Sequence, residues 1–350
     1  MGQKIENCLS DTLKNDIFTY PYNFITLGEK KERKERKLGK NSGKLKCNLI
    51  NYTPIFIGGT KIHGNELFLD DKKDFIIPAS TLKGEIRNII EAITHSCIRS
   101  KSDKIPNEFK ECTNIKELCF ACRLFGTIIE NSSNSAYSGK VFFTDAKLPK
   151  SKGKFENITL KSLMSPKENL KKYYLNTKNK IRGRKFYWHH TDKIKKSDYS
   201  VYTGKSKLNI KILEPMREFS FEVSFKNLTD IELGMLIYSL ELEKELLHKI
   251  GRGKALGLGS CKITIKSFEL DGENKYNFSS FILKMEKIDK KIYLDKIEEL
   301  YLKNNSQLKQ LRVILNEKNN LDFSKGAYIK RISNKGNMPE ILEYVSEKQF

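Results

Sequence analysis

Four stretches of the chain have the composition and pattern of β-strands. Residues 45–57 (LKCNLINYTPIFI) and 219–225 (FSFEVSF) alternate apolar and polar positions, and 139–146 (GKVFFTDA) and 261–265 (CKITI) are rich in β-forming residues. Proline has no amide hydrogen to give to a sheet, so Pro54 predicts that the central part of the first strand ends by Thr53.

Two other segments carry apolar residues at the spacing of an amphipathic helix. The first begins at Pro78-Ala79-Ser80-Thr81, where Ser80 or Thr81 can act as the N-cap. Its apolar stripe consists of Leu82, Ile86, Ile89, Ile90 and Ile93. The second is capped by Asn227-Leu228-Thr229-Asp230, and its stripe consists of Leu233, Leu236, Ile237, Leu240 and Leu247. Residues 285–317 also have helical composition.

The predicted elements follow one another as strand, helix, strand, strand, helix, strand. This order predicts an α+β fold with a ferredoxin-like, RRM-like βαββαβ core, a plan whose sheet face binds RNA in some proteins. We expect this domain at residues 44–270, with insertions at 95–138 and 147–217. Residues 1–43 are predicted to form an N-terminal arm with a basic loop, and 271–350 a partly helical C-terminal extension.

Composition excludes several classes of protein. The chain has 350 residues, of which 38% are hydrophobic, enough to build a core. No run of about 18 apolar residues is present, and the N-terminal residues lack the apolar centre of a signal peptide, so we expect a cytoplasmic protein without a membrane span. Seven cysteines in such a chain indicate metal binding or burial rather than disulfides.

The net charge of +22 is concentrated in two segments. Residues 28–46 carry nine Lys and Arg against three Glu, and residues 147–211 carry nineteen against four acidic residues. Such concentration predicts contact with a polyanion, and nucleic acid is the first candidate. The alternative is that these lysines lie on solvated loops without a ligand.

Candidate phosphate contacts lie in two places outside the glycine-rich segment. Ser80, Lys83 and Arg87 fall in the first half of the first helix, where backbone N–H groups and cations favour an anion. Three more cations lie in the second basic segment: Arg182, Arg184 and Lys185.

A glycine-rich segment with two cations joins the second helix to the last strand. It contains Gly251, Arg252, Gly253, Lys254, Gly257 and Gly259. The segment is not a Walker A loop, because no Gly-Lys-Ser/Thr ends it, and it is not a dinucleotide fingerprint, because it precedes a strand. It is predicted to approach phosphates closely. In the alternative reading, Gly251 ends the helix and the other glycines serve packing.

Four cysteines fall within 26 residues of the first insertion: Cys97, Cys112, Cys119 and Cys122. The two-residue separation of Cys119 and Cys122 lets both thiolates reach one tetrahedral ion, and four thiolates make a closed structural zinc site. His95 is an alternative ligand to Cys97. Buried free cysteines remain the other interpretation, because the Leu-Cys-Phe-Ala-Cys run is apolar.

Several of these segments together resemble the RAMP superfamily, the repeat-associated proteins of CRISPR systems. Gly251–Gly259 is similar to its signature glycine loop, 77–87 (IPASTLKGEIR) to its IPGSSLKGxxR helix start, with Ala79 for glycine, and 122–126 to CRLFG. Residues 139–146 resemble the GxVxFxDA strand, and 183–190 (GRKFYWHH) a feature of one subgroup associated with type III systems. The likeness runs from about residue 20 to 265.

The resemblance implies a backbone subunit of a type III CRISPR effector complex in antiviral defence. Such subunits bind guide RNA, meet the target RNA paired with it, and stack beside other subunits of the complex. Some relatives bind zinc at the position of the cysteine cluster. A generic RNA-binding protein outside defence is the reading that remains if the likeness is fortuitous.

Some relatives also cut target RNA through an aspartate in the loop after the first strand. In this chain Gly64 is followed by Asn65 and Glu66, and Asp70 comes later, so the expected aspartate is not in place. Asparagine is not a general base, whereas Glu66, Asp70 and His189 are candidate catalytic residues. An endoribonuclease acting on target or guide RNA, with or without a metal, is therefore the alternative function. For His189, local hydrogen bonding is the competing interpretation.

Overall fold

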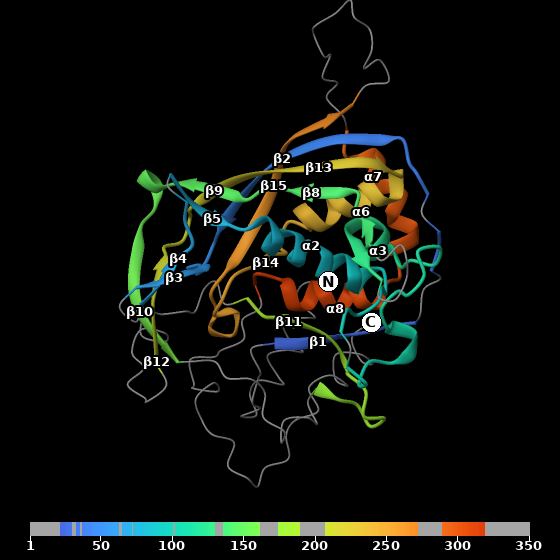
Figure 1. The fold of residues 1–350 in the computed structure, drawn as a ribbon, viewed down its shortest axis with the longest axis horizontal. Helices are drawn as coiled ribbons and strands as arrows, with labels where there is room; N and C mark the ends of the chain where they lie inside the picture. The colour runs from blue at the N-terminus through green and yellow to red at the C-terminus, as the bar shows by residue number, and fades with distance from the viewer. Residues whose placement is uncertain are drawn as a thin grey trace, which may run out of the picture.

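A computed structural model describes residues 22–29, 33–35, 37–62, 65–71, 73–100, 102–129, 136–161, 174–189, 207–271 and 289–318. The fold is mixed α+β, dominated by a curled antiparallel sheet that packs on a small number of helices (Figure 1). In this described part of the chain, no helix is long and apolar enough to cross a membrane.

The largest sheet has seven strands, and all of its neighbouring pairs are antiparallel. Its main path runs β14-β15-β2-β13-β9-β5, and β8 also pairs with β13. The strands are β2 (Asn41–Asn51), β5 (Asp74–Ile77), β8 (Val141–Phe143), β9 (Ala146–Pro149), β13 (Glu218–Leu228), β14 (His248–Lys249) and β15 (Ser260–Leu270). The predicted strand at 139–146 is therefore two short strands, and β2 ends at Asn51, before Pro54.

Helix α2 (Ala79–Ile93) follows β5, after β2, β3 (Gly58–Ile62) and β4 (Asn65–Phe68), and helix α6 (Asp230–Glu241) follows β13. Across the sheet, β15 and β13 flank β2, and β8 and β9 lie on the far side of β13. The two helices contact each other and pack against strands of this sheet. Figure 1 shows both on its concave side.

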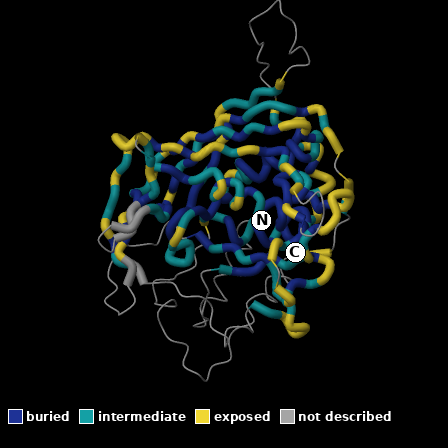
Figure 2. The backbone as a smooth tube through the Cα atoms, in the orientation of Figure 1, coloured by how far each residue is buried: buried dark blue, intermediate teal, exposed yellow. Residues whose placement is uncertain are grey.

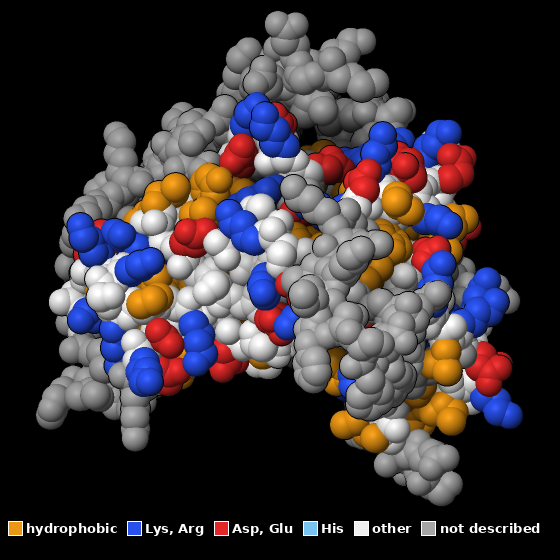
Figure 3. Space-filling model, turned by 90° about the horizontal axis from the view of Figure 1, so that it is seen from above, with side chains coloured by type: hydrophobic (Ala, Val, Ile, Leu, Met, Phe, Trp, Pro, Cys, Tyr) orange, Lys and Arg blue, Asp and Glu red, His pale blue; other side chains and the backbone are white. Residues whose placement is uncertain are grey.

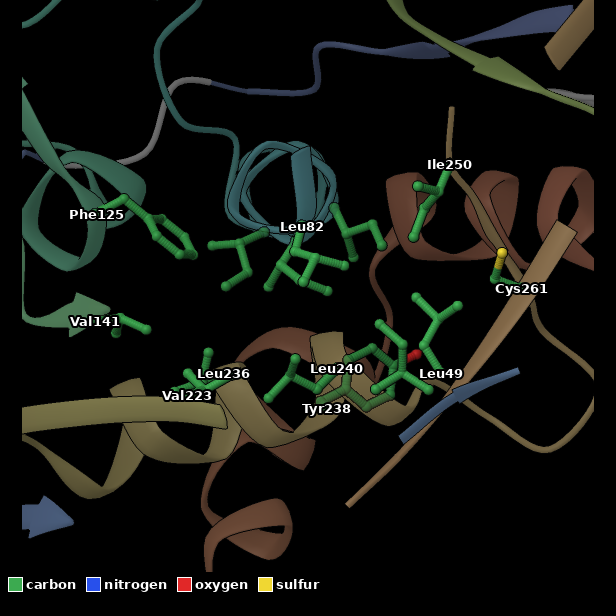
Figure 4. Close-up of a cluster of buried hydrophobic side chains, with 14 of the residues drawn as sticks. Leu49, Leu82, Phe125, Val141, Val223, Leu236, Tyr238, Leu240, Ile250 and Cys261 are labelled. Atoms are coloured by element: carbon green, nitrogen blue, oxygen red, sulfur yellow. The ribbon is translucent and has the colours of Figure 1, made fainter. Parts of the chain in front are cut away.

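The predicted apolar stripe of α2 is fully buried. Figure 4 shows Leu82 of α2 close to Leu236 and Leu240 of α6, and Figure 2 shows the buried residues gathered between the sheet and the helices below it. Helix α6 is buried on every side from Glu232 to Leu240. Leu247, predicted on its stripe, lies beyond the end of the helix but is buried as well.

The two helices begin in different ways. Thr229, one of the four residues predicted to cap α6, is its N-cap and forms a capping box with Glu232, which the sequence analysis does not predict. The prediction for α2 is wrong, because its N-cap is Pro78, which has no side-chain hydrogen bond. Instead, the Ala79 N–H donates to Asp145 Oδ1 at 2.7 Å, so a carboxylate from the β8–β9 junction lies at this positive helix end.

The basic insertion at 147–217 contains strands that its weak periodicity does not predict. β10 (Phe155–Lys161) and β12 (Lys207–Leu213) join β3 (Gly58–Ile62) and β4 (Asn65–Phe68) in a second sheet, ordered β10-β12-β4-β3. β11 (Gly183–Tyr187) pairs antiparallel with β1 (Tyr22–Thr26), so the insertion also meets the N-terminal arm. We call this pair the β1–β11 ribbon.

The first insertion carries the short helix α3 (Phe120–Phe125) and the paired strands β6 (Gly126–Ile128) and β7 (Ala136–Ser138). Helical composition after residue 285 corresponds to α7 (Lys291–Ile297) and α8 (Ser306–Leu315), with a π-helical turn between them at Glu298–Leu302. These helices share the main core rather than forming a separate unit, since α7 packs on α6 and α8 packs on the β1–β11 ribbon and α2.

The outward positions of β2 carry lysines that are already paired. Lys44 lies 3.7 Å from Glu222, and Lys46 lies 3.3 Å from Glu269. In the described part of the face seen in Figure 3, basic and acidic side chains alternate and form no continuous basic patch. Part of the first basic segment is thus neutralised within the chain.

The capping box of α6 gives a direct test of how this helix is anchored. We expect Thr229→Ala to lower the free energy of unfolding by about 1 kcal/mol, because the Glu232 N–H loses its acceptor at a buried helix start. Thr229→Ser keeps a hydroxyl acceptor and should stay close to the wild type. Chemical denaturation of the three proteins measures the difference, and equal stability of the Ala and Ser variants would contradict the assignment.

Candidate functional site

The four cysteines predicted as metal ligands lie together in the interior. Their sulfur atoms are all within 4.8 Å of one another, and Cys97 Sγ is 3.6 Å from both Cys119 Sγ and Cys122 Sγ. Four sulfurs at about 2.3 Å from a zinc ion in tetrahedral arrangement are about 3.8 Å apart, so the observed spacing fits one ion held by four thiolates. None of the four forms a disulfide.

Donors surround this cluster, as a negatively charged thiolate centre requires. Cys119 N–H donates to Cys112 Sγ at 3.3 Å, and Arg87 Nη2 donates to Cys122 Sγ at 3.3 Å. Hydrogen bonds between the sulfurs, first of all with Cys112, lower the pKa of Cys119 and raise the pKa of Cys97. Hydrogen bonds with Cys122 and Cys97 also lower the pKa of Cys112.

His95 is not part of this cluster, which corrects its assignment as an alternative ligand. Its Nδ1 is 2.8 Å from the Glu29 carbonyl oxygen, and its Nε2 is 2.8 Å from Gln307 Oε1. Both ring nitrogens are thus engaged in holding the N-terminal arm and α8 to the end of α2.

Two of the predicted RNA contacts, Arg87 and Arg184, are buried structural residues. Arg87 Nε lies 2.7 Å from Glu91 Oε1 and Arg184 Nη1 lies 2.6 Å from Glu91 Oε2, so the carboxylate bridges two guanidinium groups. Arg184 Nη2 also donates to the carbonyls of Ser96 and Cys97. These arginines fasten the cysteine cluster to α2 and β11 and do not face a ligand.

The predicted phosphate site at the start of α2 is occupied from within. Asp145 accepts the Ala79 N–H there, so a phosphate would have to compete with a carboxylate. Ser80 is exposed beside it. Lys83 is half-buried, and burial, with the charges of Arg87 and Arg99, lowers its pKa.

The glycine-rich loop is held by contacts inside the chain. Gly251, Gly253, Gly257 and Gly259 have φ angles of +90°, +73°, +88° and +80°, a region that favours glycine. A Cβ on Gly251 would lie 2.5 Å from the Phe56 carbonyl oxygen, and one on Gly259 would collide with the Ile250 carbonyl. The glycines therefore serve turn geometry and packing, which favours the alternative reading of this segment.

The same loop nevertheless carries two cationic side chains, Arg252 and Lys254, on a backbone held by hydrogen bonds. Arg252 is exposed, and its backbone N–H donates to the Phe56 carbonyl at 2.9 Å. Lys254 is half-buried and its charge acts on Glu85 of α2. Because the Lys249 N–H donates to Glu85 Oε1 at 3.2 Å, the structure brings the loop and the first half of α2 together.

The buried side chain of Lys249 forms hydrogen bonds with the backbone of this loop and with the strand that follows it. Lys249 Nζ donates to the Gly257 carbonyl at 3.0 Å and to Ser260 Oγ at 2.9 Å. Thr53 Oγ1 donates to the same Gly257 carbonyl at 3.0 Å. Burial lowers the pKa of Lys249 to about 7.

The catalytic candidates are not gathered in one place. His189 is completely buried, with Nδ1 2.9 Å from Ser260 Oγ and Nε2 2.9 Å from the Leu247 carbonyl, which favours the competing interpretation of local hydrogen bonding. Asp70 is exposed and lies 2.6 Å from Lys150 Nζ. Glu66 belongs to β4, where the described structure covers its backbone only.

The remaining two predicted contacts lie on or beside the β1–β11 ribbon. Arg182 is half-buried, and its Nε donates to the Leu175 carbonyl at 3.1 Å. Lys185 projects among tyrosine rings. Sequence reasoning missed these tyrosines because the strand pairing that collects them joins residues more than 150 positions apart.

A sequence model of the RAMP superfamily matches residues 52–262, which is more than half of the chain. The matched region spans α2, the cysteine cluster and the glycine-rich loop. No curated protein matches the chain significantly.

The bridge through Glu91 gives the prediction for this site. We expect Arg184→Ala to lower the free energy of unfolding by about 3–5 kcal/mol, because it leaves a buried carboxylate with one partner and two carbonyls without donors. Arg182→Ala, two residues earlier, should cost much less. Urea denaturation measures the free energy of unfolding of both variants. Similar losses in the two would show that the ion pairs of Glu91 do not contribute unusually to stability.

Proposed function

Because the chain belongs to the RAMP superfamily, we propose that it is a guide-RNA-binding structural subunit of a type III CRISPR ribonucleoprotein. In this role it binds CRISPR guide RNA, meets the target RNA paired with it, and packs against other subunits of the complex. The proposal extends to cytoplasmic antiviral defence, the setting that the sequence resemblance implies.

The observation that carries the proposal is the junction of the glycine-rich loop with α2 inside the matched region. Lys249 donates a hydrogen bond to the Gly257 carbonyl of the loop, and the Phe56 carbonyl accepts one from the Arg252 N–H. Arg252 is therefore held on a rigid backbone. Exposed Ser80 begins the neighbouring helix. A rigid surface with cations binds a phosphate chain at a low cost in conformational entropy.

We further propose that the core is ferredoxin-like. Support comes from the chain order β2, α2, β8, β13, α6, β15, combined with a sheet in which β15 and β13 flank β2 and β8 lies beyond β13. Residues 44–270 would then form the main domain, and the described parts of 1–43 and 271–350 would be additions packed onto it.

Zinc is the ion that we propose for the cysteine cluster. Four buried sulfurs within 4.8 Å of one another fit a closed tetrahedral site, and soft thiolate ligands favour zinc over hard cations. The ion would serve structure, because all four positions are protein ligands and none is left for substrate.

The described catalytic candidates do not favour the endoribonuclease alternative. His189 has both ring nitrogens engaged in the interior, and Asp70 is paired with Lys150. We therefore propose no cleavage reaction for this chain.

The zinc proposal predicts that the protein contains zinc and that the zinc is lost only when a cysteine of the cluster is replaced. Protein purified without chelators should contain about one zinc per chain, and Cys122→Ser should lose most of it and melt at a lower temperature, since metal binding is coupled to folding. Cys261→Ser is the matched control, because Cys261 is also buried but lies outside the cluster. Atomic emission that finds no zinc in the wild type would contradict the proposal.

The RNA proposal predicts that the protein co-purifies with repeat-containing RNA from cells that express the CRISPR locus. RNA affinity should fall steeply between about 50 and 200 mM salt, because bound lysines and arginines release condensed counterions. Changing both Arg252 and Lys254 to Ala should weaken binding by about 1–3 kcal/mol while the melting temperature stays unchanged.

Lys44→Ala combined with Lys46→Ala is the control for that experiment. It removes the same number of charges, but from lysines that pair with Glu222 and Glu269 on the sheet face. Its RNA affinity should remain near that of the wild type. Equal losses in the two double variants would indicate a general charge effect, and an RNA-free protein from expressing cells would overturn the proposed function.

A further inference from the structure

The β1–β11 ribbon has two faces of different character. Antiparallel pairing places Tyr22 opposite Tyr187 and Phe24 opposite Lys185, so these four side chains share one face. The other face carries Ile25, Arg184 and Phe186, which are buried. Arg184 reaches Glu91 of α2 from this side, whereas Tyr22, Lys185 and Tyr187 are partly exposed, so the Tyr22 face is the outer one, although its Phe24 is buried.

Three tyrosine rings surround the lysine on the outer face. Lys185 Nζ lies 3.7 Å from the centre of the Tyr22 ring, 5.0 Å from that of Tyr187 and 5.6 Å from that of Tyr174. A hydrogen bond of 2.9 Å joins the hydroxyls of Tyr22 and Tyr174. All three tyrosines are half-exposed, so the rings form a surface and not a core.

No ion pair is formed by the half-buried Lys185 with an acidic side chain among the described residues. Lys140, by contrast, is buried against Glu232 at 2.8 Å. Burial lowers the pKa of Lys185 to about 8, so the side chain is still mostly protonated at neutral pH. An ammonium group held over aromatic faces without a carboxylate is ready to accept an anionic group from outside.

We propose that the outer face of the β1–β11 ribbon is a stacking platform for single-stranded RNA, in which Tyr187 and Tyr174 stack with bases and Lys185 contacts the adjoining phosphate. This inference rests on the proposed function, since it assumes that the chain binds RNA. Lys185 Nζ is closest to the Tyr22 ring and farther from the Tyr187 and Tyr174 rings, so we assign the bases to those two rings.

The chemistry of the face selects single-stranded RNA over other occupants. Aromatic rings bind unstacked bases, which a duplex does not offer. Strand β11 of the ribbon lies within the segment 147–211, where nineteen basic residues stand against four acidic ones, so an anionic partner is favoured. A double helix would present phosphates to Lys185 but no base faces to the tyrosines.

The central experiment compares Tyr187→Leu with Tyr187→Phe in the full-length protein. The probe is a fluorescein-labelled single-stranded RNA of mixed sequence, and fluorescence anisotropy measures its affinity at fixed salt. Tyr187→Leu removes the ring and should weaken binding roughly 5- to 150-fold. Tyr187→Phe keeps the ring and should bind within about twofold of the wild type, because stacking uses the ring and not the hydroxyl.

A second comparison tests the lysine through pH. Lys185 faces the rings of Tyr22, Tyr174 and Tyr187. Burial lowers the pKa of Lys185 to about 8 and raises the pKa of Tyr187, so the ammonium group of Lys185 loses its proton between pH 7 and pH 9. Wild-type affinity should fall between pH 7 and pH 9 as the positive charge is lost. Lys185→Arg, which stays charged, should show a smaller fall, and Lys185→Met should bind weakly at both values.

Separate outcomes distinguish this inference from the proposed function. If the wild type binds no RNA, both fail. If it binds RNA while folded Tyr187→Leu and Lys185→Met bind equally well, the platform alone is wrong. Should Tyr187→Leu not fold, RNA containing 5-iodouridine is crosslinked to the wild type. Crosslinks at Tyr174 or Tyr187 support the platform, and crosslinks confined to other peptides overturn it.

Discussion

The carboxylate of Glu91 is the interaction on which the arrangement of the candidate sites depends. It accepts from Arg87 at 2.7 Å and from Arg184 at 2.6 Å, and all three side chains are almost completely buried. Each arginine also donates further hydrogen bonds. Arg87 donates to the Gly126 carbonyl and to Cys122 Sγ, and Arg184 donates to the carbonyls of Ser96 and Cys97. Removing one partner from such a buried set leaves a charge uncompensated, which costs several kcal/mol. Helix α2, the cysteine cluster and β11 are therefore held in one geometry.

This bridge connects the cysteine cluster with the proposed RNA platform. Arg184 and Lys185 are neighbours on β11, and they point to opposite faces of the ribbon. When the inner face is fixed by Arg184 to the backbone of Cys97, the outer face with its tyrosines is fixed too. A zinc ion that holds Cys97 would thus act on the position of Lys185 without touching RNA itself. In this arrangement a structural ion contributes to binding through preorganisation.

The sequence predicts the helices and the cysteine cluster well, because local spacing carries that information. The stripe of α2, the Thr229 cap and the Cys119-x₂-Cys122 pair depend on residues a few positions apart, and the structure has all three. The ribbon escapes prediction because β1 and β11 are distant in the chain. The sequence assigns Arg87 to RNA because it lies in the first half of a helix, where an anion is favoured, and Arg184 because it lies in the second basic segment. Glu91, four residues after Arg87, was the local signal of an internal pair.

The glycine-rich loop shows why packing and ligand binding are not exclusive explanations. Positive φ angles and close carbonyl contacts account for its glycines without any ligand. Yet the same contacts give the loop a single conformation, in which Lys249 and Thr53 hold the Gly257 carbonyl from below. A flexible loop with the same two cations would lose conformational entropy on binding, whereas this one has lost it during folding. The glycines that the turn needs therefore also position Arg252 and Lys254. A substitution at Gly253 is expected to lower both the stability of the fold and the affinity for RNA. Substitutions of Arg252 and Lys254 are expected to lower the affinity for RNA alone.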